Sequence, residues 1–224
     1  MKYHICQHLG LGDHIVTNAI IRKINRDIVK VLCVLEHNLE SVKFMLRDVP
    51  NLEYRIVNDE FTMMQSMAAE NNKIIDIGMY LDKTEYFNKC YYLQCNINFD
   101  ERWSRFHVER DIDREIDLLS KYNIHEGEEY IFLHEDTKRN YTIKQKYIPT
   151  DIKIVQPSKD ITNNIFDYLT LIERAKEIHV ISSCFMFLID SIKTDNKLYM
   201  HHYARYEPCY MQPLLKREWL LINN

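Results

Sequence analysis

The stretch ICQHLGLGDHIVTNAIIRKI (residues 5–24) joins a strand-like segment to a helical pattern across two closely spaced glycines. Apolar residues recur at helical spacing from Val16 through Ile24. The whole chain has only four glycines, and two of them, Gly10 and Gly12, stand in this turn. Glycine allows positive φ and lets a ligand approach the backbone, so the turn serves either as a tight strand-to-helix connection or as a ligand site.

The same alternation of strand and helix continues along the chain and indicates βαβ units with mostly parallel sheets. Strand-like segments lie at 2–6, 28–35, 52–57, 73–78, 130–134, 152–157, 177–182 and 197–201. Helical patterns lie at 13–24, 39–48, 60–70, 85–93, 109–127, 163–175, 183–192 and 214–221.

This pattern predicts an α/β fold of two small Rossmann-like βαβ halves whose sheets face a cleft. The first half covers residues 1–107 and the second covers 128–224, joined by an amphipathic connecting helix within 108–127. In that helix we expect Ile112, Ile116 and Leu119 to face inward and the acidic residues to face water. Asp111 and Asp113 form a D-x-D pattern, which we interpret as part of this solvated face and not as a metal site.

Composition restricts the class of protein. The 224 residues are 46% hydrophobic and 28% charged, as in ordinary globular chains. A net charge of −4 gives no reason to expect a nucleic acid partner, and no apolar run is long enough to span a bilayer. The amino terminus lacks the pattern of a secretion signal, and the six cysteines form no C-x-x-C pair, so we expect reduced thiols and a cytoplasmic location.

Several common catalytic motifs are absent from the sequence. The glycine turn lacks the third glycine of a dinucleotide fingerprint, and only Glu36 is available as a ribose carboxylate, which disfavours NAD binding. No P-loop, nucleophile elbow or H-E-x-x-H pattern occurs, so the sequence supports neither P-loop phosphoryl transfer, acyl transfer nor a zinc site.

Three segments resemble a known family. GLGDHIVTNAIIRKI (residues 10–24) resembles the G-x-G-D-x-[IL] turn of GT-B glycosyltransferases of the heptosyltransferase type. YIFLHEDTKRNYTI (130–143) and IFDYLTLIERAKEIHVISSCFMFLIDSI (165–192) resemble the donor-binding half of those enzymes and of α-1,6-fucosyltransferases. The resemblance implies a metal-independent transferase that moves a sugar from a nucleoside-diphosphate sugar to a hydroxyl acceptor such as a glycan. Its first half would bind the acceptor and its second half the donor, although this chain is shorter than the usual enzyme.

The resemblance also implies site residues. Asp13 would be the general base, and its neighbour His14 is a second catalytic candidate. From its position alone, Asp13 at the first helical turn either caps backbone amides or serves a ligand. The implied donor-binding residues are Gly10, Gly12, His134, Lys138, Arg139, Glu173, Ser182, Ser183, Cys184 and Phe185.

Several donor candidates also have a plain structural interpretation. Lys138 and Arg139 follow a strand and would contact phosphate, or they form an ordinary solvated basic loop. The hydroxyls of Ser182 and Ser183 and the amides of Cys184 and Phe185 would bind phosphate at a helix start, or Ser183 simply caps that helix. Glu173 would hold a ribose only by the resemblance.

The expected partners are therefore a nucleotide sugar, acting as co-substrate, and a saccharide acceptor, with no metal or other cofactor and no nucleic acid; a homodimer stays open. A non-catalytic nucleotide- or sugar-binding module and an NAD-dependent oxidoreductase remain alternatives. The sequence leaves open which sugar, base and acceptor are used, and whether the tyrosine-rich segment 80–103 is an acceptor platform or core.

Overall fold

The chain forms two compact units in a computed structural model that describes residues 2–68, 73–79, 82, 84–207 and 211–224. The first unit comprises Met1–Glu109 and Pro208–Leu214, and the second comprises Arg110–Glu207 and Leu215–Asn224. The connecting helix expected within 108–127 belongs to the second unit, and the end of the chain contributes to both units.

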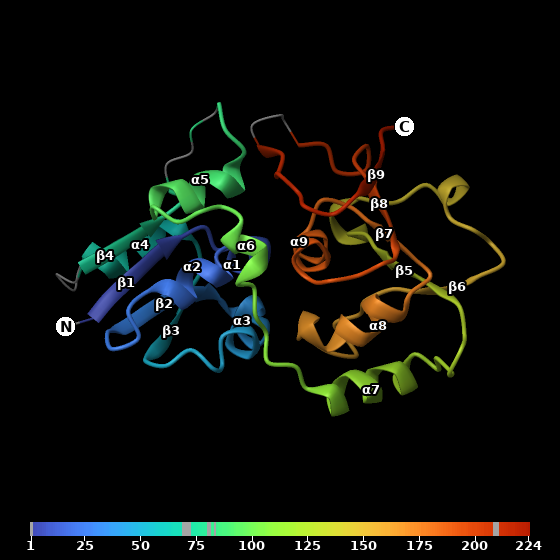
Figure 1. Cartoon of the computed structure of the whole chain (residues 1–224), viewed down its shortest axis with the longest axis horizontal. Coiled ribbons are helices and arrows are strands. Elements are labelled where there is room, and N and C mark those ends of the chain that lie inside the picture. Colours follow the sequence, from blue (N-terminus) through green and yellow to red (C-terminus); the bar gives the residue numbers. More distant parts are fainter. Residues whose placement is uncertain (1, 69–72, 80–81, 83, 208–210) are drawn as a thin grey trace. The chain divides into compact units, whose positions relative to one another are not determined.

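The first unit is built on a four-stranded, fully parallel sheet with strand order β3-β2-β1-β4 (Figure 1). Its strands are β1 (Lys2–Gln7), β2 (Val29–Leu35), β3 (Leu52–Val57) and β4 (Lys73–Ile77). Its helices are α1 (Leu11–Val16), α2 (Asn18–Lys23), η1 (Glu36–Asn38), α3 (Leu39–Met45), α4 (Glu60–Ala68), α5 (Phe87–Gln94) and α6 (Glu101–Ser104).

The helix predicted from Asp13 onward is two short helices, α1 and α2, that meet at Thr17. The Thr17 hydroxyl donates to the backbone oxygens of Asp13 (3.0 Å) and His14 (3.3 Å). Threonine that bonds back to the preceding turn in this way bends or interrupts a helix.

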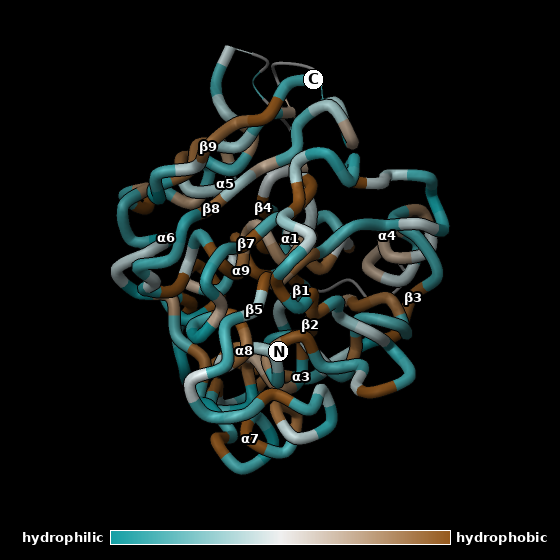
Figure 2. Tube along the Cα trace, turned by 90° about the vertical axis from the view of Figure 1, so that its right-hand side faces the viewer, coloured by the Kyte–Doolittle hydropathy of each residue, from teal (hydrophilic) through white to brown (hydrophobic). Residues whose placement is uncertain are grey.

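The core of the first unit lies on both faces of its sheet. β2 is buried along almost its whole length, as its apolar sequence, interrupted only by Lys30, predicts for a strand with helices on both sides. Cys6, Cys33, Val57, Met63 and Met67 form one cluster where α4 packs on the sheet. The tube in Figure 2 is correspondingly hydrophobic along most of β2.

The second unit has a five-stranded, fully parallel sheet with strand order β6-β5-β7-β8-β9 (Figure 1). Its strands are β5 (Tyr130–His134), β6 (Lys153–Val155), β7 (Glu177–Val180), β8 (Lys197–His201) and β9 (Trp219–Ile222). Its helices are α7 (Ile112–Lys121), η2 (Thr137–Arg139), η3 (Gln145–Tyr147), η4 (Ile165–Tyr168), α8 (Leu169–Arg174) and α9 (Cys184–Ser191).

The helix predicted at 214–221 is wrong, because this segment contains the start of the edge strand β9. A buried carboxylate explains why this segment does not form a helix. Asp190, on α9, accepts hydrogen bonds from the backbone N–H groups of Lys216 (2.9 Å) and Arg217 (3.0 Å) and from Trp219 Nε1 (3.3 Å). These bonds fix a bend at Lys216 and Arg217, directly before the strand that pairs with β8.

The predicted orientation of α7 is confirmed for Leu119, which is buried, but wrong for the two isoleucines. Ile112 and Ile116 are each about half exposed (49%), whereas Glu115 is buried with Leu118 and Leu119. Glu115 can be buried because Arg110 donates two hydrogen bonds to its carboxylate, and the backbone N–H and hydroxyl of Thr170 donate to Oε2. A carboxylate with this many donors tolerates the interior.

No helix in the described part of the chain is both long and apolar enough to cross a bilayer. The five cysteines among the described residues are free thiols, and Cys209 lies outside those residues.

We expect Asp190→Ala to destabilise the second unit by about 2–4 kcal/mol, because three N–H donors lose a charged acceptor. Urea unfolding followed by Trp219 fluorescence measures the loss. Asp195→Ala, at an exposed position before β8, is the matched control and should change stability by less than about 0.5 kcal/mol. Equal effects of the two substitutions would contradict this account of β9.

Candidate functional site

Each sheet reverses its strand order at one point, and most of the candidate residues lie near these two points. In the first unit the chain moves outward from β1 through β2 to β3 and then returns to the other side of β1 with β4. In the second it moves from β5 to β6 and returns past β5 to β7. Connections that leave adjacent strands in opposite directions leave a crevice beyond the carboxyl ends, where α/β proteins bind ligands.

Gly10 makes room for Asp13 in the first crevice. It caps α1 with an extended backbone (φ −63°, ψ 143°), so it does not use the positive φ that the sequence suggests. A Cβ at Gly10 would instead lie 2.6 Å from Asp13 Oδ2. Gly12 lies within α1 itself. The absence of a side chain at position 10 therefore leaves space for the Asp13 carboxylate at the start of α1.

Tyr91 of α5 holds the other oxygen of that carboxylate. Its hydroxyl donates to Asp13 Oδ1 at 2.7 Å, and the side chain is almost fully buried. Gly78, at the carboxyl end of β4, has φ +78°, and a Cβ there would lie 2.1 Å from two atoms of the Tyr91 ring. Gly10 and Gly78 thus each remove a side chain that would collide with one member of the Asp13–Tyr91 pair.

His8 and Glu60 complete the surroundings of this pair. The His8 ring stacks on Tyr91 with centroids 6.2 Å apart. Its Nδ1 lies 2.6 Å from Glu60 Oε1, and its Nε2 lies 3.1 Å from the Gly78 carbonyl oxygen. Both ring nitrogens therefore lie within hydrogen-bond distance of oxygen atoms.

The electrostatics of Asp13 follow from these neighbours. Burial raises the pKa of its carboxyl, while the Tyr91 hydrogen bond, the His8 charge and the backbone N–H of Asp13 lower that pKa and the Glu60 charge raises it. A raised pKa brings a carboxylate closer to the range in which it accepts a proton efficiently near neutral pH.

His14, the second catalytic candidate, is fully buried. Its Nδ1 lies 2.6 Å from Gln7 Nε2. Burial lowers the pKa of His14 to about 3, so the ring is neutral at physiological pH. This environment suits a structural side chain that fixes α1 on the end of β1.

In the second unit a hydrogen bond joins the carboxyl ends of β5 and β7. Ser183 Oγ lies 3.1 Å from Nδ1 of His134, the last residue of β5. Ser183 is the residue before α9, but its side chain makes no capping bond to that helix. The His134 ring packs on Phe185 at 4.6 Å, and burial lowers the pKa of His134 to about 4. The hydroxyl therefore links two strand ends and does not serve as a cap.

Cys184 begins α9 beside these residues. Burial raises the pKa of its thiol to about 11, whereas hydrogen bonds from the backbone N–H groups of Phe185 and Cys184 lower it. The thiol is thus protonated.

Arg205, which follows β8, is a cation that sequence reasoning missed. Its Nη1 donates to the Ser182 carbonyl oxygen at 2.7 Å, and its Nη2 pairs with Glu207 at 3.3 Å. Ser182 Oγ donates to the same Glu207 carboxylate at 2.9 Å. Since Arg205 comes directly after a strand end, as Lys138 and Arg139 do, the same positional rule would have found it.

Arg139 lies on the same side of the unit as Arg205. The two guanidinium groups lie 5.5 and 5.6 Å from the centre of the Tyr141 ring. Arg139 Nε also donates to Asp136 at 2.6 Å. Lys138 is exposed in the same η2 turn. Arg139 and Arg205 thus border the strand ends of the second unit, each paired with a neighbouring carboxylate.

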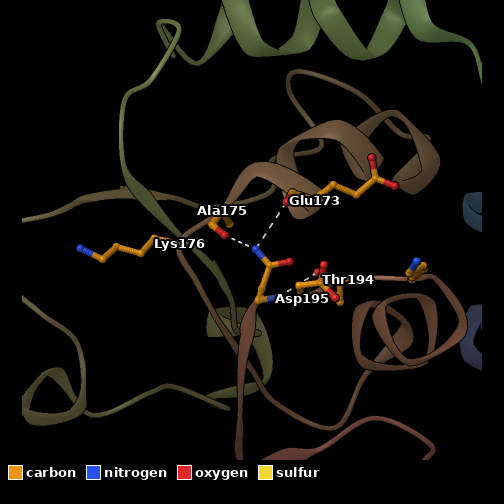
Figure 3. A pocket seen from close by; sticks show the side chains of 7 residues that line it. Glu173, Ala175, Lys176, Thr194 and Asp195 are labelled. Carbon is orange, nitrogen blue, oxygen red and sulfur yellow. Dashed lines mark hydrogen bonds between the residues drawn. The ribbon is translucent and has the colours of Figure 1, made fainter.

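Glu173 is not brought together with the other donor candidates. It lies on α8 before the amino end of β7, whereas His134 and Ser183 lie at the carboxyl ends of β5 and β7. Its carboxylate accepts two hydrogen bonds from Arg110 Nη1, at 2.7 and 2.8 Å. Glu173 also lines an open hollow of about 450 Å³ with Lys176, Thr194 and Asn196 at that opposite edge of the sheet (Figure 3).

Metal-ligating side chains do not cluster in the described part of the chain: no three His, Cys, Asp or Glu residues gather closely enough to hold an ion. Asp111 of the D-x-D pattern caps α7 by accepting from the Arg114 backbone N–H. Of the tyrosine-rich segment, Tyr91 and Tyr92 are buried, and Tyr80 lies outside the described residues.

Comparison with solved structures identifies the fold. The chain aligns over 99% of its length with 86% of a family 9 glycosyl transferase from Veillonella parvula, at a TM-score of 0.60 and 10% identity. It also aligns over 99% of its length with 90% of the E. coli ADP-heptose LPS heptosyltransferase II, at a TM-score of 0.52 and 9% identity. No protein-family model matches the sequence, and no curated protein matches it. The chain therefore has the GT-B glycosyltransferase fold, by structural similarity alone.

The Gly10 contact predicts a non-additive pair of substitutions. We expect Gly10→Ala to destabilise the first unit by about 1–2 kcal/mol, because the new Cβ must displace the Asp13 carboxylate. In an Asp13→Ala background the same change should be neutral or slightly stabilising, since the backbone of Gly10 suits alanine. Urea unfolding of the four proteins measures the coupling. An equal loss of unfolding free energy in both backgrounds would show that glycine at position 10 is not needed to accommodate the Asp13 carboxylate.

Proposed function

We propose that this protein is a glycosyltransferase that moves a sugar from a nucleoside-diphosphate sugar to a hydroxyl group of a saccharide acceptor. The observation that carries the proposal is the half-buried carboxylate of Asp13, held by Tyr91 at the crevice of the first sheet, in a chain with the GT-B fold. The acceptor binds to the first unit and the donor to the second.

The reaction joins the acceptor oxygen to the anomeric carbon of the donor sugar and breaks the bond from that carbon to the diphosphate. The hydroxyl proton passes to the carboxylate of Asp13, and the bonding electrons of the leaving group remain on the nucleoside diphosphate. A general base contributes about 10²–10⁴-fold to such a step. The raised pKa of Asp13 makes it a better proton acceptor than an ordinary exposed carboxylate.

The donor diphosphate needs positive charge as it leaves. The residues assigned to it in this proposal are Lys138, Arg139 and Arg205, with the hydroxyl of Ser183 and the amides at the start of α9. Arginine binds phosphate through two parallel N–H donors, and the start of a helix adds unpaired amides. These groups support a reaction without a metal ion. Glu173 has no part in this proposal, since it lies at the other edge of the sheet.

The first test is thermal unfolding with ADP, GDP, UDP, dTDP, CMP or NAD, each at saturating concentration. A ligand at about 100 times its dissociation constant adds about 2.7 kcal/mol to stability, enough to raise Tm by several degrees. We expect a shift with one nucleoside diphosphate, which then identifies the donor base. A shift with NAD alone would contradict the proposal, and no shift with any nucleotide would favour a module of another kind.

Arg205→Gln should weaken the binding of that nucleotide by about 10–100-fold, the factor that one charge-assisted hydrogen bond is worth. Titration calorimetry measures the affinity directly. Lys193→Gln removes an exposed cation at the opposite edge of the same sheet and should leave affinity within about twofold. If both variants bind as the parent does, Arg205 does not contact the donor.

Asp13→Asn should lower turnover by about 10²–10⁴-fold while the nucleotide affinity stays within about twofold. The measurement is release of the nucleoside diphosphate from its sugar conjugate in the presence of acceptor. A binding module without catalysis would show no acceptor-dependent release in either protein.

A further inference from the structure

We propose that Tyr91 is the positioning residue of the site: it occupies Oδ1 of Asp13, favours the ionised carboxylate, and leaves Oδ2, beside Gly10, as the oxygen that takes the acceptor proton. The assignment of Oδ2 rests on the proposed function. The control of Asp13 by Tyr91 is a property of the first unit and can be measured without any substrate.

A glycine beside each residue fixes the geometry of the Asp13–Tyr91 pair. Tyr91 comes from α5, which packs on β4, and Asp13 comes from the first turn of α1 after β1. Gly78 at the end of β4 leaves the space for the Tyr91 ring, and Gly10 leaves the space for Asp13 Oδ2. The two oxygens of the carboxylate therefore have different surroundings, a phenol at one and a bare backbone at the other.

The Tyr91 hydroxyl can only act as a donor in this contact. Burial and the neighbouring Asp13 charge both raise the pKa of Tyr91 far above its usual range, so the phenol keeps its proton. A donated hydrogen bond favours the charged form of a carboxyl over its neutral form. Tyr91 thus opposes the effect of burial on Asp13, and its proton is not itself transferred.

The other groups that act electrostatically on Asp13 are His8, after β1, and Glu60, on α4. They act in opposite directions, because the His8 charge lowers the pKa of Asp13 and the Glu60 charge raises it. They also pair with each other at 2.6 Å. Both residues stay unchanged in the variants below, so their contributions are common to every protein compared.

Tyr92 is the matched control, since it neighbours Tyr91 on α5, is equally buried and also donates one hydrogen bond. Its hydroxyl donates to the backbone oxygen of Val16 at 2.8 Å and not to a titratable group. Tyr92→Phe therefore removes a buried phenol hydroxyl of the same kind without touching Asp13.

The test is urea unfolding from about pH 4.5 to pH 8.5, followed by Trp103 of the first unit in a Trp219→Phe background that all variants share. A carboxyl whose pKa is raised by folding stabilises the protein at low pH, and this contribution is lost as pH rises through the folded pKa. Tyr91→Phe raises the folded pKa of Asp13 further. Its destabilisation should therefore grow as pH rises, whereas that of Tyr92→Phe should stay constant.

An Asp13→Asn background completes the cycle. There, Tyr91→Phe should destabilise by the same amount at every pH, because position 13 no longer titrates. Two results would overturn the inference: a pH-independent effect of Tyr91→Phe in the parent, or a pH dependence that persists in the Asp13→Asn background.

Turnover supplies a second readout once the nucleotide panel has identified a donor. Tyr91→Phe should move the acid limb of the kcat/KM profile to higher pH and lower the rate on that limb by about tenfold, with the alkaline plateau within about threefold of the parent. Full turnover in Asp13→Asn would instead refute Asp13 as the base. The unfolding experiment would still report whether Tyr91 controls its ionisation, so the two failures are distinguishable.

Discussion

The reversal of strand order in each parallel sheet is the constraint on which both candidate sites depend. All paired strands in the two sheets run parallel, so the turns that follow their carboxyl ends meet at one edge. Where connections leave in opposite directions, no helix fills the space beyond that edge. In the first unit Asp13 and Gly78 lie on the two sides of this point, and in the second unit His134 and Ser183 do so.

The residues around the two strand-order reversals differ in chemistry. The first has a half-buried carboxylate whose proton affinity is set by burial, a phenol donor and the His8–Glu60 pair. The second has neutral His134 and Ser183 at its centre, with arginines and the start of α9 around them. A carboxylate suits proton abstraction and a cationic border suits a departing phosphate, so this difference is what makes a transferase the best-supported function.

Much of the fold was predictable, because parallel strands covered on both faces have continuous apolar sequences and the intervening helices have a distinct period. The errors have particular causes. Glu115 faces the interior of its unit because Arg110 and Thr170 supply donors that no periodicity reveals. The segment 214–221 contains a strand because Asp190, far away in sequence, binds its backbone. Arg205 could have been predicted as a site residue from its position after a strand. Tyr91 could not, because nothing in the sequence distinguishes it from the other tyrosines.

By itself, the sequence determined the alternation of strands and helices, the glycine turn with Asp13 in it, and the small set of polar residues that follow strand ends, since these are local properties. Only the tertiary structure decided what each of them contacts. It paired Asp13 with Tyr91, and it placed Gly10 and Gly78 where a larger side chain would collide with one member of that pair. It also separated Glu173 from His134 by the length of a strand. Contacts between residues distant in sequence arise from strand order and packing, which local patterns do not encode.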